Sequence, residues 1–276
     1  MSAPLLELRH VGKTYGGGLF SRARTAAVRD VSFTLADDRP EVFAIIGESG
    51  SGKSSLARMI LAASPATEGQ VLFRGQDLSR LRGRRARLAF MRQVQPIFQN
   101  PFEAFNPLTR VDSYLYATAR NLGDAPDQAA AERQADAALQ QVGLSLAEVR
   151  GRFPHEMSGG QLQRAAIARA LIPGPALLVA DEPVSMIDAS LRMTIVNLFR
   201  ELRDRLRVSI VYITHDLATA YTISDRIIIM RRGEVVEAGD ARTVLSHPQH
   251  PYSIQLKDAV LSIDGAWDEA PTAQHV

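Results

Sequence analysis

The stretch of sequence that decides the fold is Val42-Phe43-Ala44-Ile45-Ile46-Gly47-Glu48-Ser49-Gly50-Ser51-Gly52-Lys53-Ser54. Residues 42–46 are apolar at every position, which is typical of a parallel β-strand buried on both faces. Residues 54–63 have a helical pattern, so the glycine-rich segment joins a buried strand to a helix. Together with the segments described below, this arrangement predicts an α/β fold with a parallel sheet.

The loop between this strand and helix matches the pattern G-x-x-x-x-G-K-[ST]. Its glycines permit backbone conformations in which successive N–H groups point inward at phosphate oxygens. The helix that follows adds its positive end to the same anion site. The pattern therefore predicts a cradle for nucleotide phosphates, in which Lys53 reaches the β- and γ-phosphates and the Ser54 hydroxyl ligates Mg²⁺.

A second buried strand pattern, residues 177–180, ends in Asp181 and Glu182. A strand that ends this way places both carboxylates at the C-terminal edge of the sheet, where phosphate sites of open α/β sheets lie. Asp181 is then placed to hold Mg²⁺, directly or through water. Because adjacent residues at a strand end diverge, Glu182 can face an attacking water and act as a general base.

The rest of the sequence alternates strand patterns with helical ones, as an α/β protein does. Between residues 100 and 154 the strand patterns vanish, which indicates a separate helical subdomain. Strands are predicted at 5–11, 31–35, 69–73, 209–214, 226–230 and 234–238, and helices at 127–142, 161–171 and 189–206.

The composition excludes several classes of protein. Of 276 residues, 46% are hydrophobic and 22% are charged, which is typical of a globular chain rather than a disordered or fibrous one. The apolar runs are too short to cross a bilayer, and we expect no secretory signal. The absence of cysteine excludes disulfides and thiolate metal sites. A formal charge of +2 is too small to indicate nucleic-acid binding.

A further motif carries a resemblance to a known family. Met157-Ser158-Gly159-Gly160-Gln161, followed by Gln163-Arg164, resembles the signature sequence of the ATP-binding cassette (ABC) family. The resemblance extends over roughly residues 5–260. Met157 stands where the family usually has leucine, and Met186-Ile187 where it usually has Ala-Leu. Both changes keep apolar bulk, so we expect altered packing rather than lost chemistry.

The resemblance implies a P-loop NTPase (RecA-like) core with an N-terminal antiparallel β subdomain and an inserted α-helical subdomain. We expect residues 1–95 to hold the β subdomain and the P-loop part of the core, and 96–160 the glutamine loop and the helical subdomain. Residues 161–240 would complete the core, and 241–276 would form a C-terminal appendage. ATP and Mg²⁺ are the implied ligands, and ATP hydrolysis is the implied reaction.

The resemblance also implies roles for single residues. Tyr15 resembles the aromatic that stacks on adenine, Gln99 the glutamine that touches Mg²⁺ and the attacking water, and His215 the histidine at the γ-phosphate. The candidates are, for ATP binding, Tyr15, Gly47, Glu48, Ser49, Gly50, Ser51, Gly52, Lys53, Ser54 and Ser55; for catalysis, Gln99, Glu182 and His215; for Mg²⁺, Ser54, Gln99 and Asp181; and for ATP bound to a partner subunit, Ser158, Gly159, Gly160, Gln161 and Asp188.

Three segments resemble one branch of the family, the oligopeptide and dipeptide importers. They are residues 98–107 (Phe-Gln-Asn-Pro-Phe-Glu-Ala-Phe-Asn-Pro), residues 247–252 (His-Pro-Gln-His-Pro-Tyr) and residues 182–185, which are similar to the second of the two paired ATPase subunits. The branch also includes importers of oligosaccharides and nickel. It implies a second ATPase subunit, two membrane permeases, indirectly a solute-binding protein, and a place at the cytoplasmic face of the membrane.

Other interpretations stay open on the sequence alone. A non-transport ABC ATPase acting on nucleic acid or ribosomes is the main alternative, supported only by the arginine-rich segment 80–87, which we interpret as a solvated basic face. A P-loop kinase shares the 47–54 element, but Glu182 is suited to activating water, which kinases exclude. A nucleotide-binding regulator without turnover would not need Glu182 and His215.

Overall fold

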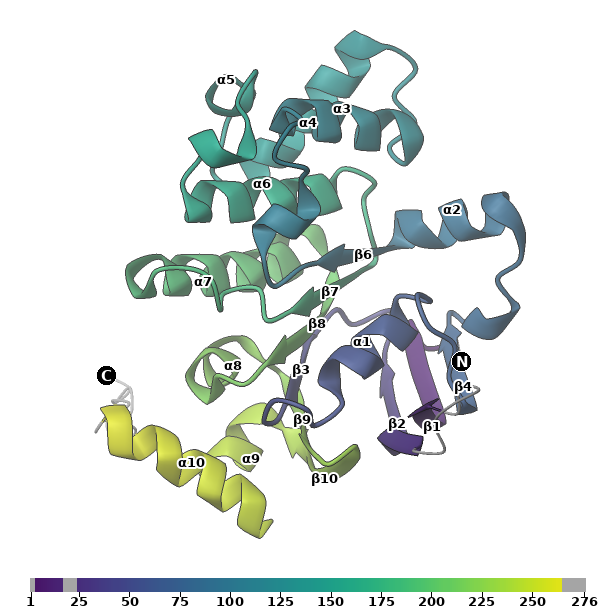
Figure 1. Ribbon diagram of the computed structural model, residues 1–276, viewed down its shortest axis with the longest axis vertical. Helices are drawn as coiled ribbons and strands as arrows, with labels where there is room; N and C mark the ends of the chain where they lie inside the picture. Colours follow the sequence, from purple (N-terminus) through teal and green to yellow (C-terminus); the bar gives the residue numbers. More distant parts are fainter. Residues whose placement is uncertain (1–2, 17–23, 265–276) are drawn as a thin grey trace, which may run out of the picture.

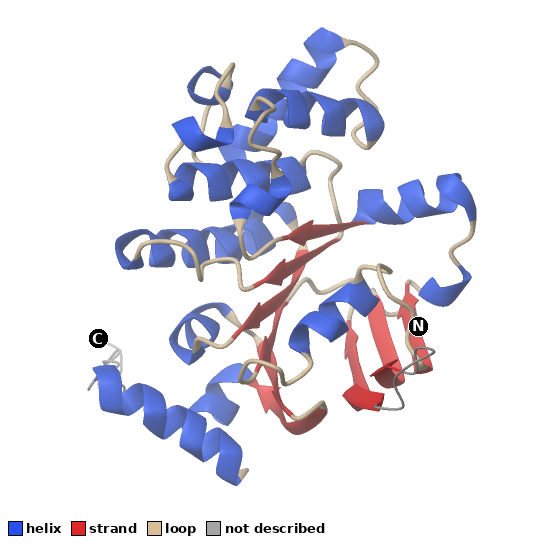
Figure 2. Ribbon diagram, in the orientation of Figure 1, coloured by secondary structure: helices blue, strands red, loops and turns tan. Residues whose placement is uncertain are grey.

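A computed structural model describes residues 3–16 and 24–264 of the chain. A central sheet runs through the molecule, a second sheet lies beside it, and a group of helices stands above one edge (Figures 1 and 2). This is the predicted mixed α/β architecture. Among the described residues, no helix is both long enough and apolar enough to span a membrane.

The central sheet has the strand order β10-β9-β3-β8-β7-β6. All of its strands run parallel except β10, which pairs antiparallel with β9. Every residue of β3 and β8 is buried, because helices or the second sheet cover both faces. The strands are β3 (Val42–Ile46), β6 (Val94–Ile97), β7 (Leu177–Asp181), β8 (Ser209–Thr214), β9 (Arg226–Arg231) and β10 (Glu234–Asp240).

The second sheet is antiparallel, with the order β2-β1-β4-β5. Its strands are β1 (Leu6–Gly16), β2 (Arg24–Leu35), β4 (Glu68–Phe73) and β5 (Gln76–Asp77). Helix α1 (Lys53–Ile60) lies between the two sheets and shares one apolar core with both of them (Figure 1). The predicted N-terminal antiparallel β subdomain is therefore confirmed.

Alternate residues of β3 point to opposite faces of the central sheet, as the pleat of a strand requires. Phe43 and Ile45 pack in the core shared with α1, whereas Val42 packs with α6 (Gly159–Leu171) and α7 (Ala189–Leu206). Ala44 and Ile46 pack in a third cluster. Its other members come from β9, α8 (Leu217–Ile223), α9 (Ala241–Ser246) and α10 (Pro251–Asp264).

The helices between β6 and β7 stand above the β6 edge of the sheet (Figure 1). They pack against α6 through a core rich in alanine and leucine, as predicted for a helical subdomain. Asp127 begins α4 by accepting a hydrogen bond from the Ala130 N–H at 2.7 Å. The elements are η2 (Pro101–Ala104), α3 (Val111–Asn121), α4 (Gln128–Gln141), α5 (Leu146–Val149) and η3 (Pro154–Glu156).

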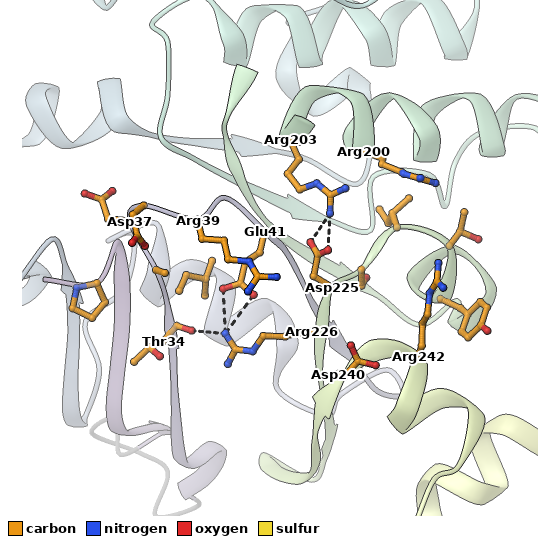
Figure 3. A pocket seen from close by; sticks show the side chains of 18 of the residues that line it. Thr34, Asp37, Arg39, Glu41, Arg200, Arg203, Asp225, Arg226, Asp240 and Arg242 are labelled. Carbon is orange, nitrogen blue, oxygen red and sulfur yellow. Dashed lines mark hydrogen bonds and ion pairs between the residues drawn. The ribbon is translucent and has the colours of Figure 1, made fainter. Parts of the chain in front are cut away.

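Ion pairs hold the central sheet at the N-terminal ends of its strands (Figure 3). Arg226 Nη1 lies 3.1 Å from Glu41 Oε1, and Arg203 Nη1 lies 2.6 Å from Asp225 Oδ2. Asp225 Oδ2 also accepts the Val42 N–H at 2.8 Å. Burial raises the pKa of Glu41 and outweighs the opposing effect of Arg226. These charged groups line a cavity of about 730 Å³ at the end of the sheet opposite the phosphate loop.

The structure adds elements that the sequence patterns did not predict. Strand β6 contains Gln95 and Pro96. Among the described residues it pairs with β7 alone, at the edge of the sheet, where proline is tolerated. The arginine-rich segment 80–87 begins at the last residue of η1 (Leu78–Arg80) and continues into helix α2 (Gly83–Gln93), of which only Phe90 is buried. The expected boundary between residues 95 and 96 falls inside β6, so the four-part division of the chain stays a prediction.

Phe199 provides a test of the packing between α7 and the sheet. Its side chain is fully buried, and its ring centroid lies 5.8 Å from that of Tyr212 on β8. Phe199→Ala is expected to lower the free energy of unfolding, measured by urea titration, by about 3–5 kcal/mol. Leu206→Ala, at the exposed end of the same helix, is the control and should lower it by less than about 1 kcal/mol. Equal losses would contradict this packing.

Candidate functional site

The loop between β3 and α1 has the backbone that a phosphate cradle needs. Gly50 and Gly52 have φ angles of 81° and 106°, in the left-handed region that favours glycine. A Cβ on Gly52 would lie 2.2 Å from the Ala27 carbonyl oxygen of β2, and a Cβ on Gly47 would lie 2.2 Å from the Met230 carbonyl oxygen of β9. The glycines therefore let the loop pass close to two strands.

Lys53 lies inside this loop and is only 4% exposed. Its Nζ donates hydrogen bonds to the carbonyl oxygens of Gly47 at 2.6 Å and Glu48 at 2.9 Å. Burial lowers the pKa of Lys53, and the charges of Glu182, Asp181 and Glu48 oppose that shift. A buried ammonium held by carbonyl groups and facing carboxylates can exchange these partners for phosphate oxygens.

Asp181 ends β7, at the C-terminal edge of the sheet where the sequence places it. Burial raises the pKa of Asp181, while a hydrogen bond with the Ser54 hydroxyl and the charge of Lys53 partly oppose the rise. The side chains of Ser54 and Asp181 therefore meet, although 127 positions separate them in the sequence (181 − 54). A hydroxyl and a carboxylate next to a phosphate cradle are ligands that Mg²⁺ accepts, because it usually binds one or two protein groups, substrate phosphates and waters.

Glu182, Gln99 and His215 come together from the ends of three neighbouring strands. Gln99 follows β6, Glu182 follows β7 and His215 follows β8. Gln99 Nε2 donates a hydrogen bond to Glu182 Oε2 at 3.2 Å, and His215 Nδ1 lies 3.2 Å from Glu182 Oε1. Each oxygen of the carboxylate thus contacts one of the two predicted neighbours.

The backbone at Glu182 is strained. Its φ angle of 47° is in the left-handed region, which a non-glycine residue adopts at a cost of about 1–3 kcal/mol. The Glu182 N–H donates to the Ile213 carbonyl at 2.8 Å, and the Ser185 hydroxyl donates to the Glu182 carbonyl at 3.0 Å. These bonds hold the strained turn that directs the carboxylate toward Gln99 and His215.

Tyr15 lies near the end of β1 and is 38% exposed. The Lys13 Nζ stands 5.1 Å from the centroid of its ring. Tyr15 pairs with Thr25 of β2, two residues before Ala27, whose carbonyl approaches Gly52. The ring thus belongs to the strand pair that borders the cradle, where one of its faces can receive a base.

The signature segment does not join this cluster within the chain. Ser158 caps α6: its hydroxyl accepts the Gln161 N–H at 3.2 Å, and the Gln161 side chain accepts the Ser158 N–H at 3.1 Å. Asp188 precedes α7 and is exposed, and its side chain makes no capping hydrogen bond. Figure 1 shows α6 in the upper helical group, away from the loop that leads into α1.

Two contacts of the loop were not predicted from the sequence. The Gly233 N–H, in the turn between β9 and β10, donates to the Ser51 carbonyl at 3.0 Å. The Tyr252 hydroxyl, from α10, accepts the Glu48 N–H at 3.0 Å. In the sequence, Tyr252 stands out only as part of the segment 247–252, and no local signal indicates that it reaches a loop 204 positions earlier.

The loop also has unused capacity for an anion. A Cβ on Gly50 would meet no atom within 4 Å, so the space beside this glycine is open. The buried Ser51 hydroxyl has no hydrogen-bond partner among the described residues. Together with the buried Lys53 ammonium, these features fit a phosphate group, because a buried polar atom without a partner is costly.

The fold and this site define a P-loop nucleoside triphosphatase. A family model described as "ABC transporter" matches residues 28–185, more than half of the chain. The chain therefore belongs to the ABC transporter family, as an ATPase subunit, and the predicted family and reaction are confirmed.

Named relatives support the same assignment. The chain is 38% identical to the oligopeptide transport ATP-binding protein AppF of Bacillus subtilis, over 93% of this chain and 78% of AppF. It is 34% identical to AmiF of Streptococcus pneumoniae, also an oligopeptide transport ATP-binding protein, over 94% of this chain and 82% of AmiF. Among solved structures, it is similar to the dimeric ATP-binding cassette MJ0796 bound to ADP and Pi, with a TM-score of 0.75 and 27% identity. The match covers 86% of this chain and 99% of the MJ0796 chain.

The raised pKa of Asp181 predicts an effect on stability. A carboxyl whose pKa is higher in the folded than in the unfolded chain destabilises the fold when it is ionised. Asp181→Asn should therefore raise the melting temperature at about pH 8 without nucleotide or Mg²⁺. The difference should shrink as the pH falls through the raised pKa.

Asp204→Asn is the control for this experiment. A hydrogen bond with Arg203 lowers the pKa of Asp204, so its ionised form favours the folded chain. This variant should lower the melting temperature at about pH 8, and less so at acidic pH. Scanning fluorimetry at several pH values measures both variants. Shifts in the same direction at about pH 8 would contradict the account of Asp181.

Proposed function

We propose that this chain hydrolyses ATP at the cluster of Lys53, Glu182, Gln99 and His215, within a dimer of ATPase subunits that drives a peptide-type importer. The observation that carries this proposal is the contact of both Glu182 oxygens with Gln99 and His215, next to a loop that encloses Lys53. A carboxylate held by two neighbours beside a phosphate cradle is suited to orient and deprotonate a water.

In this proposal the loop 47–55 binds the phosphates through its N–H groups and Lys53, and Tyr15 stacks on adenine. Glu182 accepts a proton from the attacking water, which Gln99 and His215 help to position. Ser54, Asp181 and Gln99 are the residues that would hold Mg²⁺. When bound, Mg²⁺ neutralises charge on the phosphate oxygens.

The position of the signature segment, in which Ser158 and Gly159 are exposed, supports a site shared between two subunits. The N-terminus of α6, with Ser158, Gly159 and Gly160, offers backbone N–H groups to an anion but lies away from the chain's own loop. We assign it, with Gln161 and Asp188, to an ATP held by the partner subunit. ATP would then join two half-sites, and hydrolysis would release them.

The cargo and the partners are inferred from the relatives. AppF and AmiF are named as oligopeptide transport ATP-binding proteins. We infer that this chain powers uptake of oligopeptides, dipeptides or related solutes such as oligosaccharides. It would work with a second ATPase subunit, two permeases and, indirectly, a solute-binding protein, at the cytoplasmic face of the membrane.

Glu182→Gln tests the proposed base. The amide cannot accept the proton of the attacking water, so kcat should fall by about 10²–10⁴-fold. ATP affinity should stay within about twofold of wild type, because the loop is unchanged. Phosphate release and equilibrium binding of ATP measure the two quantities.

Lys53→Ala is the companion variant and should abolish nucleotide binding. Phosphate release by the wild-type chain, without any added acceptor, separates this ATPase from a kinase. A Glu182→Gln variant with wild-type turnover would remove Glu182 as the base, and a Lys53→Ala variant with wild-type affinity would remove the cradle.

Copurification tests the partners. A tagged chain, expressed in its native cell and extracted from membranes in mild detergent, should bring down two polytopic permeases and a second ABC ATPase subunit, identified by mass spectrometry. The Lys53→Ala variant should retain the permeases, because its change lies in the nucleotide site. Recovery with ribosomes or nucleic acid, and without membrane proteins, would instead favour a non-transport ATPase.

A further inference from the structure

The C-terminal helix contributes a side chain to the phosphate loop. Tyr252, in the first turn of α10, is 4% exposed and packs in one cluster with Ile46, the last residue of β3. Its hydroxyl oxygen accepts the Glu48 N–H at 3.0 Å. Arg231, at the end of β9, stands over the Tyr252 ring, with its Cζ 4.7 Å from the ring centroid. The ring is therefore fixed on several sides, and its hydroxyl is aimed at the loop.

The peptide unit that Tyr252 contacts is the one that holds Lys53. The Glu48 N–H and the Gly47 carbonyl belong to the same planar peptide, in which they point in opposite directions. On one side the carbonyl accepts Lys53 Nζ at 2.6 Å, and on the other the N–H donates to Tyr252 at 3.0 Å. Hydrogen bonds on the two ends of an amide polarise each other, so the bond to the Tyr252 hydroxyl strengthens the bond between the Gly47 carbonyl and Lys53.

The segment before Tyr252 is built to place it there. The Glu237 carboxylate of β10 accepts the Gln249 N–H at 2.9 Å and the His250 N–H at 3.2 Å. His250 Nδ1 in turn accepts the Tyr252 N–H at 3.1 Å. Pro251 is the first residue of α10, a position that proline favours. The backbone N–H groups of this turn are thus bound to a carboxylate of β10, which restricts the position of Tyr252.

We propose that Tyr252 is a positioning residue for ATP binding: its hydroxyl fixes the Gly47–Glu48 peptide, and through that peptide the Lys53 ammonium. The inference rests on the proposed function of the loop and adds a role for the C-terminal segment. Tyr252 itself touches no phosphate in this account. It holds the loop in its binding conformation before ATP arrives, and so removes an ordering cost from binding.

Tyr252→Phe removes only the hydroxyl and keeps the buried ring. The dissociation constant for ATP, measured by equilibrium binding, should rise about fivefold, which corresponds to about 1 kcal/mol. KM for ATP should rise with it, while kcat at saturating ATP stays within about twofold, because ground state and transition state lose the same contact. If Tyr252 served only to stabilise the fold, the substitution would change the melting temperature without raising KM for ATP.

Tyr114→Phe is the matched control. The Tyr114 hydroxyl accepts a backbone N–H in the same way, from Asn106 at 2.9 Å, but in the helical group above β6. It should leave the ATP dissociation constant unchanged. Glu237→Ala tests the same inference without changing Tyr252. It removes the carboxylate that holds the turn before Tyr252, so it should also weaken ATP binding.

The outcomes separate this inference from the proposed function. Weaker ATP binding in Tyr252→Phe and Glu237→Ala, but not in Tyr114→Phe, supports the inference. Wild-type affinity in Tyr252→Phe overturns it, and so does an equal loss in Tyr114→Phe. If Lys53→Ala abolishes binding while Tyr252→Phe does not weaken it, only the positioning role fails. If Lys53→Ala binds ATP normally, the proposed function of the loop fails as well.

Discussion

The structure depends on one electrostatic arrangement, a buried ammonium facing two carboxylates at the C-terminal edge of a parallel sheet. Lys53 begins α1, Asp181 ends β7 and Glu182 follows it, so the fold brings opposite charges together. Burial disfavours the charged forms of Lys53 and Asp181 at this site. Two carbonyl groups of the loop accept hydrogen bonds from Lys53, and the Ser54 hydroxyl forms a hydrogen bond with Asp181. Such a site is prepared for a polyanion with its metal ion, which can satisfy charges of both signs.

The rest of the fold positions the residues at this edge of the sheet. Ion pairs such as Arg203–Asp225 fix the opposite ends of the strands, and the antiparallel sheet holds α1 from its other side. Three strand ends deliver Gln99, Glu182 and His215 to one point, and the strained backbone at Glu182 is held by neighbouring strands and turns. The signature segment, by contrast, lies in the helical group at the start of α6, apart from the chain's own phosphate loop.

Much of this could be predicted from the sequence because the signals are local. The apolar strand at 42–46, the glycine pattern, and the helix and strand at 189–206 and 209–214 each follow from neighbouring residues. What could not be predicted depends on contacts made at a distance. Strand β6 forms despite Pro96 because β7 offers its edge, and Tyr252 reaches Glu48 only through the turn that Glu237 holds. Neither has a local signature, since the partners lie far apart along the chain.

The central claim is that this edge of the sheet holds the triphosphate and directs Glu182 at its terminal phosphate. The most direct measurement is a crystal structure of the dimer with Mg²⁺ and a non-hydrolysable ATP analogue. The account predicts the γ-phosphate within hydrogen-bond distance of Lys53 Nζ, and an ordered water between that phosphate and the Glu182 carboxylate. A nucleotide bound elsewhere, or a Glu182 side chain turned into bulk solvent in the closed dimer, would contradict it.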